Sequence, residues 1–208
     1  ARAKPTKLSC CGAAFKQRLL YSNRASLSLT LIMMADGGGG GGGGDDVVFV
    51  YTGGEQEAPE DVRHIIIDRS VKIIPKKAFR YRFHLLSVEM HEDVEKIEEF
   101  AFDNCHSLTG IKLLGVTEVE QFAFGSCDRL SEVEFGVKLE IIGRNAFSGC
   151  PIRSLKLPSI RIIEHGAFNN CLQLTDVEFG SYLETIVYDS FIHCHNLRRI
   201  AIPLKDNI

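Results

Sequence analysis

The chain has 208 residues, of which 45% are hydrophobic and 25% charged, and its formal net charge is −3 at pH 7. This length and apolar content allow one globular body with a sizeable core. The acidic balance argues against a nucleic-acid partner, since phosphate binding needs clustered Lys and Arg, and no apolar run approaches the roughly 18 residues that would span a bilayer.

Residues 1–46 differ in composition from the rest of the chain, and we interpret them as a disordered leader. Residues 1–34 carry six basic side chains and no acidic one, which is typical of an organellar transit peptide. An alternative is that translation begins at Met33 or Met34, in which case the leader is an artefact of the gene model. Residues 37–44 are eight glycines, for which we expect a flexible tether. A phosphate-binding loop would instead end in Gly-Lys-Ser/Thr.

Residues 47–61 are expected to cap the N-terminal end of the body that follows. Residues 47–51 are a short apolar stretch typical of a strand, and the polar sequence TGGEQEAPED comes directly after it. A half-copy of the repeat described next begins at Val62 and includes Ile65 and Ile67. We therefore predict a boundary between residues 61 and 62.

Residues 62–208 contain about six units of a repeat 21–23 residues long. Each unit has a phenylalanine that follows an alanine, or Ser190 in the last unit: Phe79, Phe102, Phe124, Phe147, Phe168 and Phe191. Aliphatic side chains stand five and eight residues before each phenylalanine. Three residues after it comes Arg82 in the first unit and a cysteine in the others: Cys105, Cys127, Cys150, Cys171 and Cys194. Such a period predicts a solenoid in which neighbouring units bury one another's apolar faces.

An apolar triplet with gaps of three and two residues completes each unit. The six triplets are Leu85, Val88, Met90; Leu108, Ile111, Leu113; Leu130, Val133, Phe135; Ile152, Leu155, Leu157; Leu174, Val177, Phe179; and Leu197, Ile200, Ile202. The last two members alternate with one polar residue, which is the pattern of a strand with one buried face. Burying a large apolar side chain stabilises the fold by about 1.5–3 kcal/mol. Stacked units bury enough of them to offset the conformational entropy lost on folding, which one unit alone could not.

The repeated segments IEEFAFDNC, VEQFAFGSC, IGRNAFSGC and IEHGAFNNC, together with the LxxLxL triplets, resemble the BspA-type subclass of leucine-rich repeats. The resemblance covers residues 62–204. It implies an α/β repeat protein, a right-handed leucine-rich-repeat solenoid with a parallel β-sheet on one face and short helical or turn segments on the other, used chiefly to bind proteins. Three departures affect local geometry: Arg82 replaces cysteine, Ser190 replaces alanine, and one residue is missing after Cys150, where Pro151 follows.

The five cysteines of the repeat are interpreted as structural thiols. They occupy one equivalent position, so we expect an interior column in which each acts as a small hydrophobe. Parallel side chains on neighbouring coils do not reach the Cβ separation that a disulfide prefers, and no CxxC pair is present for zinc. The HExxH and Gly-x-Ser-x-Gly motifs are also absent. We therefore predict no catalytic residue, metal or cofactor, and hence no enzyme.

Two surfaces are predicted to contact a protein partner. The first is a row of alternating charge formed by the polar residue inside successive triplets: Glu89, Lys112, Glu134, Lys156 and Glu178. If the strands lie in register, neighbouring charges are opposite, which favours support of the register over recognition because the row neutralises itself. The second is the C-terminal end, where Leu197 and Ile200 border an apolar edge. We expect either further repeats there or self-association.

The function predicted from the sequence is a non-catalytic protein–protein interaction scaffold with a partner of unknown identity. We expect a cytoplasmic or otherwise intracellular location, because the cysteines are interpreted as reduced thiols, or an organellar one if residues 1–34 are a transit peptide. The alternative is a secreted or cell-surface adhesion or structural protein, as among bacterial members of the family that the chain resembles. Against this alternative, the sequence contains no Asn-x-Ser/Thr glycosylation site.

Overall fold

The computed structural model describes residues 48–203, all within the second of the two compact units of the chain, Gly40–Ile208. The expected leader at residues 1–46 lies outside the described residues. Between residues 48 and 203 the chain forms fourteen strands, which pair in parallel. No helix that could cross a bilayer occurs in this part of the chain.

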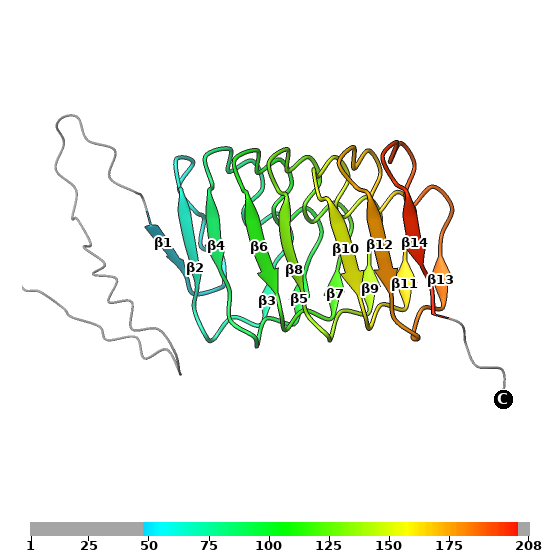
Figure 1. The fold of residues 1–208 in the computed structure, drawn as a ribbon. Coiled ribbons are helices and arrows are strands. Elements are labelled where there is room, and N and C mark those ends of the chain that lie inside the picture. The colour runs from blue at the N-terminus through cyan, green and yellow to red at the C-terminus, as the bar shows by residue number, and fades with distance from the viewer. Residues whose placement is uncertain (1–47, 204–208) are drawn as a thin grey trace, which may run out of the picture. The chain divides into compact units, whose positions relative to one another are not determined.

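Eight strands, one from each coil, run side by side at the front of the solenoid in Figure 1. They are β1 (Val48–Tyr51), β2 (His64–Ile67), β4 (Ser87–Glu89), β6 (Gly110–Leu113), β8 (Glu132–Phe135), β10 (Ser154–Leu157), β12 (Asp176–Phe179) and β14 (Arg199–Ala201). More and less exposed side chains alternate along the six strands from β2 to β12, so that in β10 Leu155 and Leu157 face the core. The triplets therefore form the predicted strands. We call the outward side of these eight strands the strand face.

The front strands form two sheets. Strands β1, β2, β4, β6 and β8 are hydrogen-bonded in that order, and β10, β12 and β14 form a separate sheet. The interruption between β8 and β10 falls in the unit that lacks one residue after Cys150, where Pro151 has no N–H to donate. We attribute the interruption to this shortened turn.

The aliphatic residues before each repeat phenylalanine form a second sheet on the opposite side of the core. Its six strands have two residues each: β3 (Ile73–Ile74), β5 (Lys96–Ile97), β7 (Glu118–Val119), β9 (Ile141–Ile142), β11 (Ile162–Ile163) and β13 (Thr185–Ile186). They are hydrogen-bonded continuously from β3 to β13. The coils therefore stay joined by this sheet at the point where the front sheet is interrupted.

Short helical or turn segments were expected between the second sheet and the front strands; turns connect them, and short helices are absent from residues 48–203. The reason is a left-handed backbone at two positions of each unit, two residues before and two residues after the repeat phenylalanine. These positions are Lys77, Tyr81, Phe100, Asn104, Phe122, Ser126, Asn145, Gly149, Gly166, Asn170, Asp189 and His193, all with φ between 52° and 82°. A residue with positive φ ends a right-handed helical run, so no helix can extend through these turns.

The repeat phenylalanines form a stacked column inside the solenoid. Ring centroids of successive members lie 5.1–5.6 Å apart, and Tyr51 of β1 packs edge-on against Phe79 at the N-terminal end. The first five phenylalanines are fully buried, whereas Phe191 in the last unit is partly buried. Their backbones also pair from coil to coil, as where Phe124 N–H donates to the Ala146 carbonyl at 2.8 Å. The predicted interior column of phenylalanines is thus confirmed.

The cysteine column lies beside the phenylalanines. Each Sγ donates to the backbone carbonyl of the repeat phenylalanine one coil earlier, at 3.1–3.3 Å. Burial raises the pKa of the Cys105 thiol to about 12 and also raises those of Cys127 and Cys150. The four thiols from Cys105 to Cys171 are buried, whereas Cys194 is only half-buried. The interior placement is therefore confirmed for four of the five.

Two departures from the repeat preserve its hydrogen bonds. Arg82, at the cysteine position, donates from Nε to the Ala58 carbonyl at 2.9 Å, which takes the place of the thiol contact. Ser190, at the alanine position, is buried, and its hydroxyl donates to the Glu164 carbonyl at 3.1 Å. Arg82 and Ser190 thus each donate a hydrogen bond to a backbone carbonyl group inside the stack.

Candidate functional site

The predicted row of charges lies on the strand face, and all five of its side chains are exposed. Lys112 and Glu134 are register partners on β6 and β8, and their Nζ and Oε2 atoms are 3.2 Å apart. Lys156 and Glu178 are register partners on β10 and β12, but they form no ion pair within the described residues. Glu89 and Lys112 are not register partners, because β4 and β6 pair only where Ser87 meets Gly110.

The row is therefore not the continuous ladder that the sequence predicts. It is interrupted between β4 and β6, where the ladder ends after one pair, and again between β8 and β10, where the sheet ends. Among residues 48–203 it contributes one ion pair, Lys112–Glu134. Its role in binding a partner stays a prediction.

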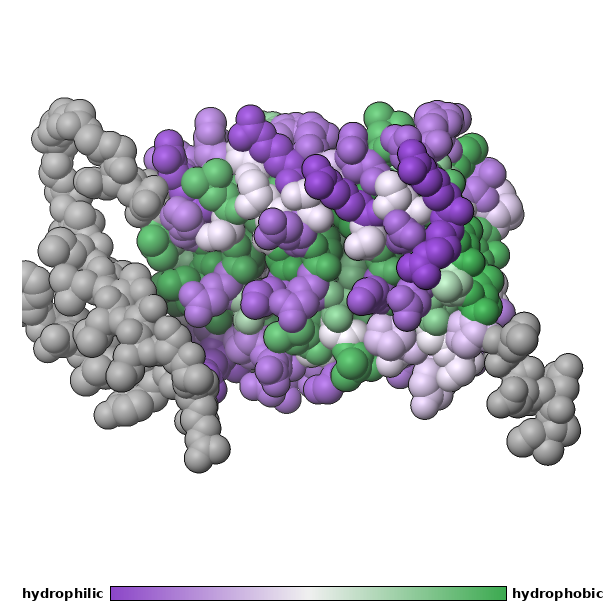
Figure 2. Space-filling model, in the orientation of Figure 1, coloured by the Kyte–Doolittle hydropathy of each residue, from purple (hydrophilic) through white to green (hydrophobic). Residues whose placement is uncertain are grey.

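A groove of about 540 Å³ crosses the strand face over β4, β6 and β8. Its lining includes the small residues Ser87 and Gly110 and the partly buried apolar side chains Met90 and Val133. The charged members of the lining are Glu89, Lys112, Glu132 and Glu134. Figure 2, which views this face, shows apolar surface exposed between separate groups of hydrophilic side chains over the middle strands. Glu132 was not among the residues singled out from the sequence, since it lies in the gap between Leu130 and Val133, outside the alternating part of the triplet.

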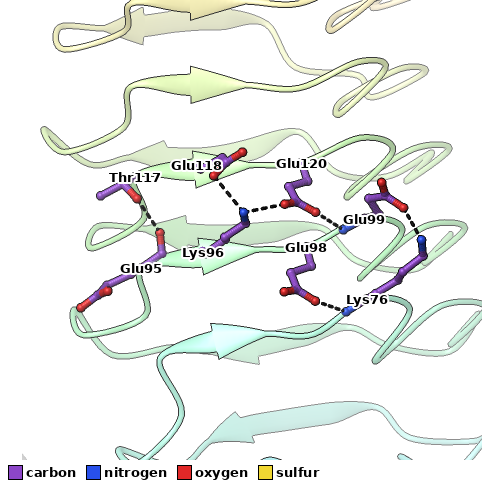
Figure 3. Close-up of polar contacts among 8 residues, drawn as sticks. All are labelled: Lys76, Glu95, Lys96, Glu98, Glu99, Thr117, Glu118 and Glu120. Atoms are coloured by element: carbon purple, nitrogen blue, oxygen red, sulfur yellow. Dashed lines mark hydrogen bonds and ion pairs between the residues drawn. The ribbon is translucent and has the colours of Figure 1, made fainter.

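The outer side of the second sheet carries a different arrangement of charge, shown in Figure 3. Lys96 lies between two carboxylates of the next coil, with its Nζ 3.0 Å from Glu118 and 2.6 Å from Glu120. The hydrogen bonds to these carboxylates raise the pKa of Lys96. Lys76 forms a further ion pair with Glu99.

Carboxylates on this side also accept backbone N–H groups from the preceding coil. Glu98 accepts from the Lys76 N–H at 2.8 Å, Glu120 from the Glu99 N–H at 3.0 Å, and Glu164 from the Arg144 N–H at 3.0 Å. The three glutamates stand at one repeat position, four residues before the phenylalanine. The charges of the second sheet thus serve to hold neighbouring coils together.

A cluster of aromatic side chains on the turns of the first three units was missed from the sequence. The guanidinium carbon of Arg80 lies 4.4 Å from the ring centroid of Tyr81 and 4.8 Å from that of Phe100. Phe100 in turn stacks on Phe122 at 5.3 Å. The signal was available, because two residues before the repeat phenylalanine the second and third units have the rings Phe100 and Phe122, where later units have Asn145, Gly166 and Asp189. The cluster joins the turns of neighbouring coils.

The C-terminal coil leaves apolar side chains at the surface. Ile200 of β14 is 47% exposed, whereas its register partner Val177 on β12 is fully buried. Leu197 is partly buried against the core, and Ile186 of β13 is exposed. Strands β13 and β14 each end their sheet, so each presents one edge with no neighbouring strand among residues 48–203.

The His, Cys, Asp and Glu side chains of residues 48–203 form no metal-binding cluster. No three His, Cys, Asp or Glu side chains there converge as metal ligands would. The thiols of the repeat donate hydrogen bonds to the backbone carbonyl groups of the repeat phenylalanines.

Comparison with known proteins identifies the repeat. A family model described as a BspA type leucine rich repeat region matches in six copies, over residues 58–171 and 112–208. No curated protein is similar to the chain at a significant level. Among solved structures, the chain is similar to the T. pallidum leucine rich repeat protein TpLRR, with a TM-score of 0.63 and 28% identity over 66% of this chain and 68% of that one.

Two further solved structures share less with the chain. A leucine rich cell surface protein from Faecalibacterium prausnitzii A2-165 has 18% identity and a TM-score of 0.42, over 71% of this chain and 61% of that one. A leucine-rich repeat protein from Bacteroides ovatus ATCC 8483 has 17% identity and a TM-score of 0.45, over 71% of this chain and 60% of that one.

Proposed function

Because this chain belongs to the family of BspA-type leucine-rich repeat proteins, we propose that it is a non-catalytic scaffold that binds a protein partner through its strand face. The observation that carries this proposal is the groove over β4, β6 and β8. In it a hollow, apolar side chains and charges without ion-pair partners among residues 48–203 occur together. Such a combination is typical of a recognition surface.

The second sheet supports this choice by contrast. Charged side chains there pair with one another or with backbone N–H groups of the preceding coil, as around Lys96, so a partner would have to compete with contacts already made. On the strand face, Glu89 and Glu132 form no ion pair among residues 48–203. A partner can therefore gain interactions there without breaking existing ones.

Affinity capture from the native source tests the proposed function. The wild-type chain is compared with Glu89→Lys, which changes the strand face, and with Glu57→Lys, which makes the same change at an exposed loop residue away from it. A partner recovered by the wild type and by Glu57→Lys, but depleted with Glu89→Lys, supports the proposal. Equal recovery with both variants would rule out binding at this face.

Self-association through the C-terminal coil is a second part of the proposal. The exposed Ile200 and the partly buried Leu197 lie at the end of the stack, and two such ends can meet about a two-fold axis that buries the same residues of both copies. The open strand edges of β13 and β14 favour this contact, because each carries backbone groups that a second strand could pair. Its test is described in the Discussion.

An intracellular location is also part of the proposal. Five free thiols lie in the repeat column, and thiols persist in compartments that keep cysteine reduced. Microscopy of the tagged full-length chain tests this. An external location would instead favour the adhesion or structural role considered from the sequence.

A further inference from the structure

We infer that the groove over β4, β6 and β8 binds an extended peptide segment that carries lysine or arginine side chains. This inference rests on the proposed function, because it names the chemistry of the partner that the strand face binds. Three observations carry it: how the groove is formed, which charges line it, and how these charges differ from those on the rest of the strand face.

The groove is formed by small residues at a gap in the strand ladder. The one register pair between β4 and β6 is Ser87 with Gly110. At this pair a bound peptide would meet only the hydroxymethyl group of Ser87, because Gly110 has no side chain. The Ser87 hydroxyl is held within 2.7 Å of His64 Nδ1 on β2, on the side of β4 away from β6. On the other side of Gly110, β6 and β8 pair at four positions. A hollow thus lies beside a rigid strand pair.

The charges that line the groove are mostly negative. The lining has three carboxylates, from Glu89, Glu132 and Glu134, and one ammonium group, from Lys112. The ammonium is already paired with Glu134 at 3.2 Å, which leaves Glu89 and Glu132 on either side of it without an ion pair among the described residues. A basic side chain entering the groove would therefore meet two free carboxylates, whereas an acidic one would be repelled.

The second half of the strand face does not share this imbalance. On β12 and β14, Asp176 pairs with Arg199 at 3.0 Å, and Lys156 on β10 lies in register with Glu178 on β12. Opposite charges are thus matched one to one over these three strands. The acidic excess is confined to the groove, so charge directs a basic segment to it.

The dimensions of the groove suit an extended segment. From β4 to β8 there are two inter-strand spacings, or about 10 Å, which three extended residues cover at about 3.3 Å each. The volume lies within the range of about 300–1,000 Å³ seen for ligand sites. The apolar side chains Met90 and Val133 in the lining would contact the aliphatic part of a lysine or an apolar neighbour.

The test uses the purified full chain and two synthetic probes, Ac-Lys-Leu-Lys-Leu-Lys-NH2 and its counterpart with glutamate for lysine. Amide chemical shifts are followed by nuclear magnetic resonance during titration. The lysine probe is expected to shift the amides of β4, β6 and β8, Gly110 among them, while the glutamate probe leaves them unchanged. Glu132→Gln removes one carboxylate and is expected to weaken binding of the lysine probe about two- to five-fold, which is the effect of losing one exposed ion pair. The matched variant Glu57→Gln, at an exposed loop residue away from the strand face, is expected to leave the binding unchanged.

Three outcomes would overturn the inference: equal shifts with both probes, lysine-probe shifts spread over the surface instead of centred on β4 to β8, and equal weakening by both variants. Shifts of the same amides on dilution of the chain alone would assign the groove to a second copy and overturn it as well. The capture experiment separates this failure from that of the proposed function. If Glu89→Lys still depletes the captured partner while the lysine probe does not bind, the strand face binds a partner of another chemistry.

Discussion

At the scale of single residues, the phenylalanine column places a fully buried ring in each of the first five repeat units. Phe124 lies between Phe102 and Phe147, with ring centroids 5.1 Å from each, and its side chain is fully buried. Such a ring contacts the units on both sides of its own. Its loss therefore weakens three coils at once.

Replacing Phe124 with alanine is expected to lower the free energy of unfolding by about 3–5 kcal/mol, because the change removes buried apolar surface and leaves a cavity between stacked rings. Urea unfolding followed by circular dichroism measures this. Tyr188→Ala is the matched control, since that aromatic side chain is 73% exposed and its loss is expected to cost less than about 0.5 kcal/mol. Similar losses in both variants would contradict the interior role of the column.

The buried thiols make stability depend on alkaline pH. Burial raises the pKa of Cys105 to about 12, above its unfolded value of about 8.5. The thiol therefore stabilises the fold fully below pH 8.5, and this contribution is lost as the pH rises toward 12. Above about pH 9, this titration is expected to lower the free energy of unfolding of the wild type by about 1.4 kcal/mol per pH unit. Cys105→Ala removes the titrating thiol, so its free energy of unfolding should fall less steeply with pH by that amount.

Urea unfolding at pH 8, 9.5 and 10.5 measures this difference. Ser190→Ala, a change at a buried residue of the repeat that does not titrate, should follow the wild-type pH dependence throughout. A Cys105→Ala curve parallel to wild type would mean that the thiol ionises as easily in the folded chain as in the unfolded one.

The phenylalanine and cysteine columns could be predicted from the sequence, because each column comes from one repeat position whose side chains are apolar and belong in the core. The hydrogen bond from each thiol to a phenylalanine carbonyl could not, since it depends on how far one coil rises to the next. The left-handed positions were also missed. Lys77, Phe100 and Phe122 are not residue types that favour positive φ. Asn145 does favour it, but one residue does not define a repeat position. The repeated left-handed backbone is therefore visible only in the stacked coils.

At the scale of elements, the front strands are predictable and their pairing is not. Alternation within each triplet locates a strand, but whether β4 pairs fully with β6, or β8 with β10, depends on the turns between them. The sequence pointed to a shortened turn at Pro151 without showing that the sheet would end there. The second sheet was missed because a two-residue strand has no alternation to detect.

One ion pair in the charge row provides a test of register. Lys112→Gln removes the contact with Glu134 and is expected to lower the free energy of unfolding by about 0.2–1 kcal/mol at low salt. Lys156→Gln, where no ion pair forms with Glu178, is expected to cost less. In 1 M salt, where the screening length is about 3 Å, the two variants should become equally stable. Thermal unfolding at both ionic strengths measures this, and equal losses at low salt would show that the pair does not support the register.

At the scale of the whole molecule, the described coils form a stack with a difference between its ends. At the N-terminal end, β1 covers β2 at four register positions and places the buried Tyr51 against Phe79. At the C-terminal end, β13 and β14 leave Ile186 and Ile200 exposed. This asymmetry is why we place self-association at the C-terminal coil.

Replacing Ile200 with lysine is expected to convert a self-associating chain into a monomer, because a charge then lies where two apolar ends would meet. Sedimentation equilibrium over a range of protein concentrations measures this. Val137→Lys is the control, since that side chain is 73% exposed in the connection after β8 and lies outside the C-terminal coil. A wild-type chain that stays monomeric at the highest concentration would exclude association through this end.

Hydrogen exchange of the chain, alone and bound to the partner captured from its native source, tests the central claim most directly. If the strand face is the binding surface, amides of β4, β6 and β8 exchange more slowly in the complex, and those of the second-sheet strands β5, β7 and β9 are unchanged. Protection confined to the second sheet or to the turns around Phe100 and Phe122 would contradict the claim.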